Sequence, residues 1–151
     1  MRDILRTLVL LVTFVGGIWA FYTYLRNSRL RRAEWLLSLY EKFYEQDHYK
    51  RIRHVIDYET SELDKLGQGL EAGGGNELVE LFVDYLNFFE FIASLWRLGQ
   101  LSLDEIRMMF EYYLMRLTDF EFIMRFIRAQ GFETLRALLI KIQETGQRRP
   151  C

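Results

Sequence analysis

The residues best suited to catalysis or metal binding are few and poorly spaced. His48 and His54, the two histidines, lie six residues apart in a charged stretch, and neither belongs to an HExxH motif. Cys151 is the single cysteine, which excludes an internal disulfide and a cysteine-based zinc cluster. The glycines at 73–75 follow no strand and precede no lysine, unlike a phosphate-binding loop. We therefore expect no metal, no cofactor and no enzymatic activity.

One enzymatic alternative is a helical ribonuclease of the kind found in toxin and defence systems. Such an enzyme needs an arginine more than one helical turn before its histidine. Arg51 and Arg53 stand too close to His54, and no arginine occupies positions 41–43 ahead of His48. A cryptic ribonuclease is thus the least supported function.

Glu90 is the polar residue whose surroundings are most unusual. It lies in the run Asn87-Phe-Phe-Glu90, with apolar neighbours in sequence and at helical spacing. A buried carboxylate must be paired or hydrogen-bonded, because an isolated buried charge costs several kcal/mol. Arg51 and Arg53 are the expected partners in a structural ion pair, with Asn87 as a second polar group of the core. The alternative is a polar pocket for a ligand.

The elements that carry these residues are all predicted to be helical. Residues 31–45 and 49–58 have apolar side chains at helical spacing, and 60–76 is the one loop-like stretch. Asn76 is a candidate N-cap for a densely apolar central helix that ends before Gly99. Ser102 to Glu105 forms a capping box for the next helix, to about 117. Thr118 begins a second cap signal, for a helix ending near 131, and the last helix spans 134–145.

The N-terminal segment has a different character. Residues 7–25 contain no charged side chain, and as a helix of about 1.5 Å per residue they match a hydrocarbon core of about 30 Å. A core helix of this length would normally have one polar face, which this segment lacks. We predict a transmembrane anchor, with a buried core helix as the alternative.

The flanks of the segment predict its orientation. Arg26, Arg29, Arg31 and Arg32 follow the span, and the positive-inside rule then places the rest of the chain in the cytoplasm, with the N-terminus outside. The same arginines would contact anionic lipid headgroups, each contributing about 1 kcal/mol near the surface. The expected location is the bacterial inner membrane, with a single pass.

Small residues form a stripe on the predicted span. Thr13, Gly16, Gly17 and Ala20 recur at helical spacing, which allows close approach of a second helix in lipid, although glycine is also common in lone spans. The cytosolic part adds 19 aromatic residues, and aromatic side chains are enriched at interface centres. We expect a homo-oligomer.

Charge divides the chain in the same way. Residues 1–32 hold six arginines and one aspartate, a net charge of +5, whereas the remainder holds 14 basic and 20 acidic side chains, a net −6. An acidic surface repels polyanions, which argues against general nucleic-acid binding. The predicted organisation is an anchor with a basic flank (1–32), a cytosolic helical domain (33–146) and a tail (147–151), and the fold class is all-α.

The run from Asn87 to Glu105 resembles a family of short bacterial proteins of unknown function. Its members have one membrane span and a cytosolic helical domain with an N-F-[FL]-E stretch followed by G-x-[IL], matched here by Asn87–Glu90 and by Gly99-Gln-Leu101. The likeness covers roughly residues 30–130. The overall layout is also similar to small membrane proteins that accompany RNA-guided (CRISPR) antiviral systems, some of which form pores and others of which sense a cyclic oligonucleotide. This chain lacks the degenerate R-x-H nuclease motif of the pore-forming ones.

Two functions follow as expectations. The first is a non-enzymatic, oligomerising effector or interaction module in antiphage defence, in which case a pore requires a ring of subunits. The second is a membrane-tethered sensor that binds a cyclic nucleotide signal through its cytosolic domain. Either would have membrane lipids and a protein or nucleotide partner.

Overall fold

The computed structural model describes the backbone of residues 2–73 and 75–146, and the side chains of these residues except 2–13 and 29. Every regular element in these ranges is an α-helix, as the sequence predicts: α1 (Arg2–Glu45), α2 (Asp47–Tyr58), α3 (Thr60–Ala72), α4 (Glu77–Arg97), α5 (Leu103–Thr118), α6 (Glu121–Ala129) and α7 (Glu133–Gly146). The chain divides into two units, residues 1–42 and residues 43–151. We call them the N-terminal unit and the helical body.

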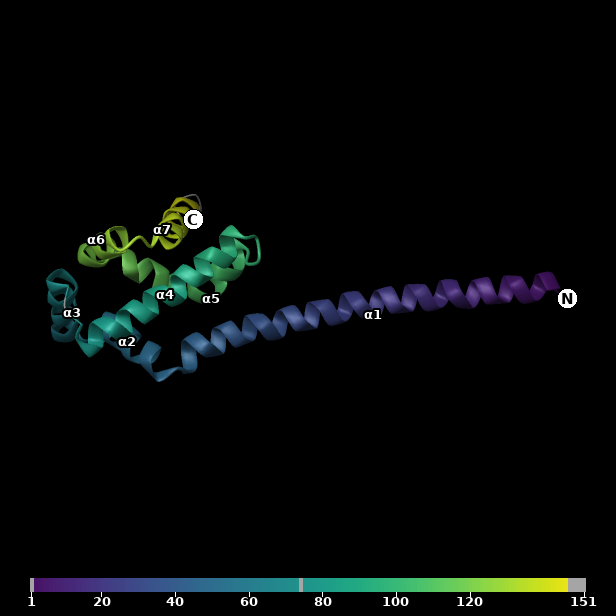
Figure 1. The fold of residues 1–151 in the computed structure, drawn as a ribbon, viewed down its shortest axis with the longest axis horizontal. Coiled ribbons are helices and arrows are strands. Elements are labelled where there is room, and N and C mark those ends of the chain that lie inside the picture. Colours follow the sequence, from purple (N-terminus) through teal and green to yellow (C-terminus); the bar gives the residue numbers. More distant parts are fainter. Residues whose placement is uncertain (1, 74, 147–151) are drawn as a thin grey trace. The chain divides into compact units, whose positions relative to one another are not determined.

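The N-terminal unit is formed by one uninterrupted helix. Helix α1 contains both the predicted span and the amphipathic stretch after it, without a break between them (Figure 1). Among the residues whose side chains are described, no helix combines the length and the apolar character that a membrane crossing requires. The first part of the predicted span, residues 7–13, lies outside those residues.

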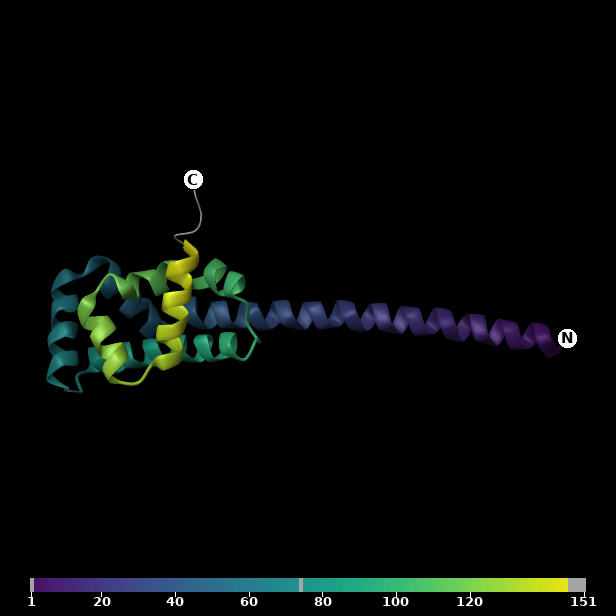
Figure 2. The same ribbon diagram turned by 90° about the horizontal axis from the view of Figure 1, so that it is seen from above.

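Helix α4 is the central element of the helical body. It packs against α2, α3 and α7, and Figure 2 shows α7 lying across α4 and α5. Its apolar residues are buried on most sides, as expected for a helix with several neighbours. One stripe is left exposed, formed by Glu80, Asp84, Asn87 and Phe91.

Helix α3 corrects the prediction of a loop over residues 60–76. Three leucines, Leu63, Leu66 and Leu70, recur on one face and are buried against the rest of the body. This burial outweighs the two glycines inside the helix, each of which costs about 1 kcal/mol relative to alanine. Gly69 also permits close packing, because a Cβ there would lie 2.7 Å from Val79 Cγ2. Gly73, in the left-handed conformation, ends the helix.

The predicted helix boundaries are largely confirmed by their caps. The Asn76 side chain accepts a hydrogen bond from the Val79 N–H at 2.8 Å, and the reciprocal bonds of the Ser102/Glu105 capping box are both formed. Gly99 adopts φ 69° just after α4. The predicted cap at Thr118 is wrong, because its hydroxyl instead donates to the Met115 carbonyl at 2.7 Å.

Aromatic rings form the centre of the body. The Phe43 ring lies 5.3 Å from those of both Phe88 and Phe89 and 5.2 Å from that of Phe110, measured between centroids. Tyr85 joins the same cluster at 5.7 Å from Phe43. Stacked, tilted and edge-on ring contacts of this kind add to the stabilisation from apolar burial.

Candidate functional site

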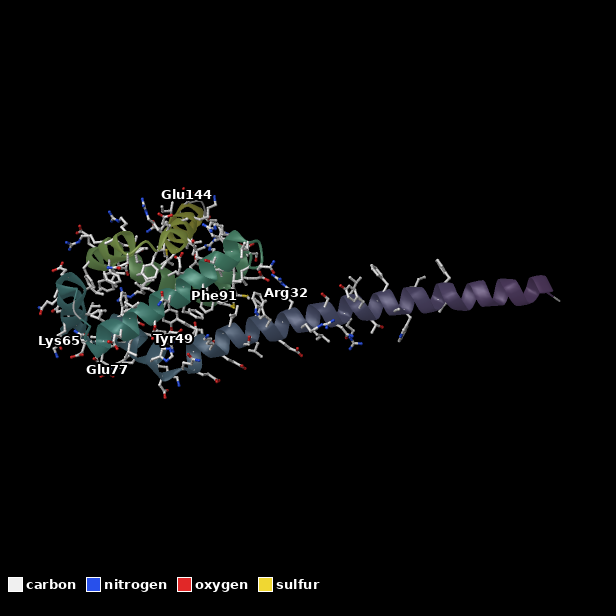
Figure 3. The ribbon with its side chains drawn as sticks, in the orientation of Figure 1. Arg32, Tyr49, Lys65, Glu77, Phe91 and Glu144 are labelled. Atoms are coloured by element: carbon white, nitrogen blue, oxygen red, sulfur yellow. The ribbon has the colours of Figure 1, made fainter. Side chains whose placement is uncertain are left out.

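The longest run of exposed apolar side chains among the described residues lies on α1. Five aromatic side chains of residues 14–25 (Phe14, Trp19, Phe21, Tyr22 and Tyr24) are between 60% and 72% exposed. Their positions in the sequence place them on several sides of the helix, so there is no polar face. Figure 3 draws side chains that project from more than one side of α1. We call residues 14–25 the apolar segment. An apolar surface of this extent is typical of contact with a membrane or another protein.

The small-residue stripe lies on the same segment. Gly16, Gly17 and Ala20 are exposed, and a Cβ added at either glycine would meet nothing within 4 Å. The side chain of Thr13 lies outside the described residues. Nothing in the described part of this chain therefore covers the stripe, and it is open to another molecule.

Exposed cations follow the apolar segment. Arg26, Arg31 and Arg32 are all exposed, whereas the side chain of Arg29 lies outside the described residues. A continuous helix joins these arginines to the apolar segment. Along α1, the apolar segment is thus followed by a basic stretch and then by an amphipathic one.

Glu90 is hydrogen-bonded, as predicted, but its predicted partners are wrong. Its Oε2 accepts a hydrogen bond from the Leu135 N–H at 2.7 Å, and its Oε1 accepts one from the Thr134 N–H at 3.3 Å. These amides belong to the first turn of α7, where backbone N–H groups have no partner within the helix. The carboxylate of α4 therefore caps α7 from outside, and its charge is compensated by the positive end of that helix.

The two arginines expected beside Glu90 bind elsewhere. Arg51 is exposed and pairs with Glu77 at 3.0 Å. Arg53 is half-buried, and its guanidinium donates to the carbonyl oxygens of Phe43 and Tyr44, at 3.1 Å for Tyr44. These carbonyls belong to the last turn of α1, so Arg53 satisfies groups that a helix end leaves unpaired.

Arg53 also has aromatic neighbours. Its guanidinium carbon lies 4.7 Å from the Phe43 ring centroid, 5.1 Å from that of Tyr44 and 5.6 Å from that of Tyr113. Contact with the faces of these rings stabilises a cation away from bulk water. Arg53 therefore fixes the end of α1 to α2 and α5.

The prediction of Asn87 as a core residue is wrong. Asn87 is exposed, on the outer stripe of α4 with Asp84 and Phe91. Its phase on the helix places it about 60° from Glu90, far enough to change its environment from partly buried to exposed. Asn87 and Glu90 are therefore close in sequence but do not form one polar cluster.

Tyr85 is a buried polar residue that the sequence did not single out. Its side chain is fully buried, and its hydroxyl has no hydrogen-bond partner. Burial raises the pKa of this hydroxyl well above its usual value of 10.0, although the nearby Arg53 cation lowers it in part. In sequence Tyr85 resembles any apolar helix position, so only the structure reveals it.

A second polar network joins α2 to α5. Asp57 Oδ1 accepts hydrogen bonds from the Tyr112 hydroxyl at 3.0 Å and from Arg116 Nε at 3.2 Å. Arg116 also donates to Asp119 at 2.7 Å and to the Ile56 carbonyl at 2.9 Å. The bond to Asp57 raises the pKa of Tyr112. More than fifty residues of chain separate Asp57 from its partners, and no local pattern indicates such a contact.

Two further observations concern ligands. An open pocket of about 180 Å³ lies between α3 and α6, with Glu71, Phe122, Arg125 and Phe126 in its lining. Arg125 Nη2 is 3.3 Å from Glu71 Oε1 in an exposed ion pair. Within the described residues, no group of three or more His, Cys, Asp and Glu side chains is placed to hold a metal ion.

Most aromatic side chains of the helical body are buried or partly buried within it. Of the 17 aromatic residues in 43–146, only Tyr58, Phe91 and Tyr112 are exposed. The aromatic side chains of the body therefore give little support to a subunit interface there. The exposed aromatic surface lies mainly on α1.

These features define a class of protein: an all-α helical body that follows a long helix with an exposed apolar segment. Residues 10–134 match the model of a domain of unknown function, DUF4760. The chain belongs to that family. Comparisons with curated proteins and with solved structures give no match.

Proposed function

We propose that this protein is a membrane-anchored, non-enzymatic interaction protein whose helical body lies in the cytoplasm. The observation that carries the proposal is the apolar segment, which exposes large apolar side chains around the whole helix. Water is a poor environment for such a surface, whereas the hydrocarbon core of a membrane is a favourable one. Together with the uncharged residues 7–13, the segment provides the length of one span.

The basic flank supports one orientation. Arg26, Arg31 and Arg32 are exposed immediately after the apolar segment, where they can contact the anionic headgroups of the cytoplasmic leaflet. Trp19, Tyr22 and Tyr24 lie toward the C-terminal end of the segment, near the proposed headgroup level that amphipathic rings prefer. The N-terminus is then outside, and the location is the bacterial inner membrane.

Assembly into a homo-oligomer is the second part of the proposal. The uncovered stripe of Gly16, Gly17 and Ala20 allows close approach of identical helices, where packing drives association in lipid. A ring of such helices would permit ion leakage, which a single span does not. We extend this to an oligomerising effector in antiphage defence, on the layout shared with small membrane proteins of RNA-guided antiviral systems.

One observation favours the sensor as a second candidate. The pocket between α3 and α6 offers two phenylalanine rings and the Arg125 guanidinium, groups that stack on and bind nucleobases and phosphates. Titration of the full chain in detergent with cyclic oligonucleotides tests this candidate. Saturable binding that Arg125→Ala or Phe126→Ala weakens would favour the sensor, and absence of binding would leave the effector.

Carbonate extraction of membranes tests the anchor. The full chain should stay in the pellet, whereas the variant Val15→Lys/Ile18→Lys should move to the supernatant, because each lysine near the centre of a span costs about 3 kcal/mol. Leu98→Lys/Met108→Lys is the matched control, since these two side chains are exposed in the helical body. The control should stay in the pellet. Recovery of the unaltered chain in the supernatant would refute the anchor.

Dye leakage from vesicles tests the effector. Gly16→Leu/Gly17→Leu should lower both the oligomer mass in nanodiscs and the leakage, and should leave insertion intact because leucine is more apolar. Val15→Leu, which is adjacent to the stripe, is the control and should change neither quantity. A monodisperse monomer of the unaltered chain at micromolar concentration would refute assembly and pore formation together.

A further inference from the structure

Exposed rings of α2 and α5 come together at one place on the helical body. Tyr58 is 77% exposed and Tyr112 is 57% exposed, and they are two of the three exposed aromatic residues in 43–146. The imidazole of His54, whose side chain is 59% exposed, lies 5.4 Å from the Tyr58 ring between centroids. We call His54, Tyr58 and Tyr112 the ring patch.

Asp57 connects the two tyrosines of the ring patch. Its Oδ1 accepts the hydrogen bond from the Tyr112 hydroxyl at 3.0 Å, and Tyr58 is the next residue of α2. Tyr58 also contributes to the raised pKa of Tyr112, whose main cause is the bond to Asp57. A ring that is already held by such a bond loses little conformational freedom when a partner binds. Tyr112 is therefore preorganised for contact with a partner.

The charges around the ring patch make it acidic. Three carboxylates lie within or beside it, those of Asp57, Glu59 and Asp119. The guanidinium of Arg116 is shared between Asp57 and Asp119, so one positive charge meets three negative ones. Helix α2 ends at Tyr58 and has no basic residue of its own in its last turn, although the negative end of a helix favours a cation.

We propose that the ring patch binds an arginine side chain presented by a partner protein. A guanidinium stacks on the face of an aromatic ring, is attracted by its quadrupole and forms strong hydrogen bonds to carboxylates. The patch is far smaller than a standard interface of roughly 20–30 residues on each side, so it fits one short segment of the partner. The inference rests on the proposed role as an interaction protein and names the chemistry of its partner.

Two other occupants fit the ring patch less well. A single-stranded nucleic acid stacks its bases on exposed rings, but its phosphates would be repelled by the three carboxylates. An apolar segment would take water away from these carboxylates and give them no counter-charge in return. A cationic segment satisfies both the rings and the carboxylates, and it is the only one of the three that does so.

Peptide binding to the full chain tests the proposal. The chain is held in nanodiscs of phosphatidylcholine, a lipid without net charge that does not itself attract a cationic peptide. The probe is a fluorescent Gly/Ser peptide with two arginines, and its matched control has citrulline, which is uncharged and similar in shape, at both positions. The arginine peptide should bind at least about fivefold more tightly, and about 1 M salt should reduce this difference by screening the charges.

The other occupants are outcomes of the same measurement. Absence of binding by the arginine peptide, or equal affinity for the citrulline peptide, would overturn the proposal. Tighter binding of an oligothymidine would assign the rings to nucleic acid, and tighter binding of a norleucine peptide would assign them to an apolar segment. Either result would also overturn the proposal.

Variants of Tyr58 separate ring stacking from apolar contact. Tyr58→Leu keeps an apolar side chain without a π-face and should weaken binding of the arginine peptide about fivefold, whereas Tyr58→Phe keeps the ring and should keep the affinity. Phe91→Leu, which replaces the other exposed ring of the body, is the matched control and should leave the affinity unchanged. Unchanged affinity in Tyr58→Leu, or an equal loss in Phe91→Leu, would overturn the ring patch.

A charge variant completes the test. Asp119→Asn removes one carboxylate from beside the ring patch and should weaken binding of the arginine peptide about twofold, whereas Glu80→Gln, at an exposed position on α4, should not. Equal affinities of these two variants would overturn the role of charge. Failure of the peptide to bind would overturn the ring patch and leave the membrane anchor standing. Recovery of the unaltered chain in the carbonate supernatant would refute the anchor alone, because peptide binding is then measured in solution.

Discussion

Glu90 offers the sharpest test of how the helical body is held together. In Glu90→Ala, the Leu135 and Thr134 amides at the start of α7 lose their acceptor. The 2.7 Å bond is charge-assisted and contributes about 1.5–3 kcal/mol, whereas the 3.3 Å bond is long and contributes little. Because no cation is left unpaired, we expect a loss of about 2 kcal/mol in the free energy of unfolding, below the 3–5 kcal/mol typical of a broken buried ion pair.

Urea unfolding of the full chain in mild detergent, followed by near-ultraviolet circular dichroism of the aromatic core, measures this loss. With a slope of about 2 kcal/mol per molar urea, the midpoint should fall by about 1 M. Glu90→Gln keeps one acceptor oxygen and should lose about half as much. Asn87→Ala, at an exposed position on the same helix, is the control and should change the free energy by less than about 0.5 kcal/mol.

Hydrogen exchange identifies the mechanism. The Leu135 and Thr134 amides should exchange faster in Glu90→Ala than in the unaltered chain, because they are no longer held by the carboxylate. Unchanged exchange at both amides would refute the cap. A double-mutant cycle tests the ion pair expected from the sequence. A coupling energy of more than about 1 kcal/mol between Glu90→Ala and Arg53→Ala would show that these two side chains interact, against the structure.

Three further predictions concern other polar groups of the helical body. Tyr85→Phe should raise the free energy of unfolding by about 1 kcal/mol, because it removes a hydroxyl without a partner. Tyr44→Phe should lower it by a similar amount, because it loses a hydrogen bond of 3.2 Å to the Met109 carbonyl, and urea midpoints measure both changes. The raised pKa of Tyr85 keeps this hydroxyl protonated in the folded state, whereas in the unfolded state it loses its proton near pH 10. The free energy of unfolding should therefore fall above pH 10, by about 1.4 kcal/mol per pH unit from this group. The fall should be shallower in Tyr85→Phe, and an identical pH profile would contradict this. Arg53→Met should lower the free energy of unfolding by about 2 kcal/mol, because carbonyls at the end of α1 lose their donor. Arg51→Met should lower it by less than about 1 kcal/mol, because its ion pair with Glu77 is exposed. Thermal unfolding that ranks the two variants in reverse would refute the role given to Arg53.

Helix α3 forms against the local preference of its glycines, because burial of its leucines is worth more. The glycines in residues 60–76 favour a loop, yet Leu63, Leu66 and Leu70 form a helix because α4 and α6 bury them. Local propensity differs by about 1 kcal/mol at each glycine, which burial of three leucines exceeds. The spacing of these leucines is visible in the sequence, and it indicates the helix more strongly than the glycines oppose it.

The sequence by itself determined the all-α class and most helix ends. Asn76, Ser102 and Gly99 act on backbone groups within about four residues, so their effect is written locally. It also determined that Glu90 needs a partner, since the cost of an isolated buried charge does not depend on the fold. Which partner it has was decided by tertiary structure, because the α7 amides lie 44 and 45 residues away and α4 and α7 must first cross. The pairing of Asp57 with Arg116 and the burial of the Tyr85 hydroxyl were decided in the same way, since a contact between distant segments depends on how whole helices pack and not on the residues beside it in the chain.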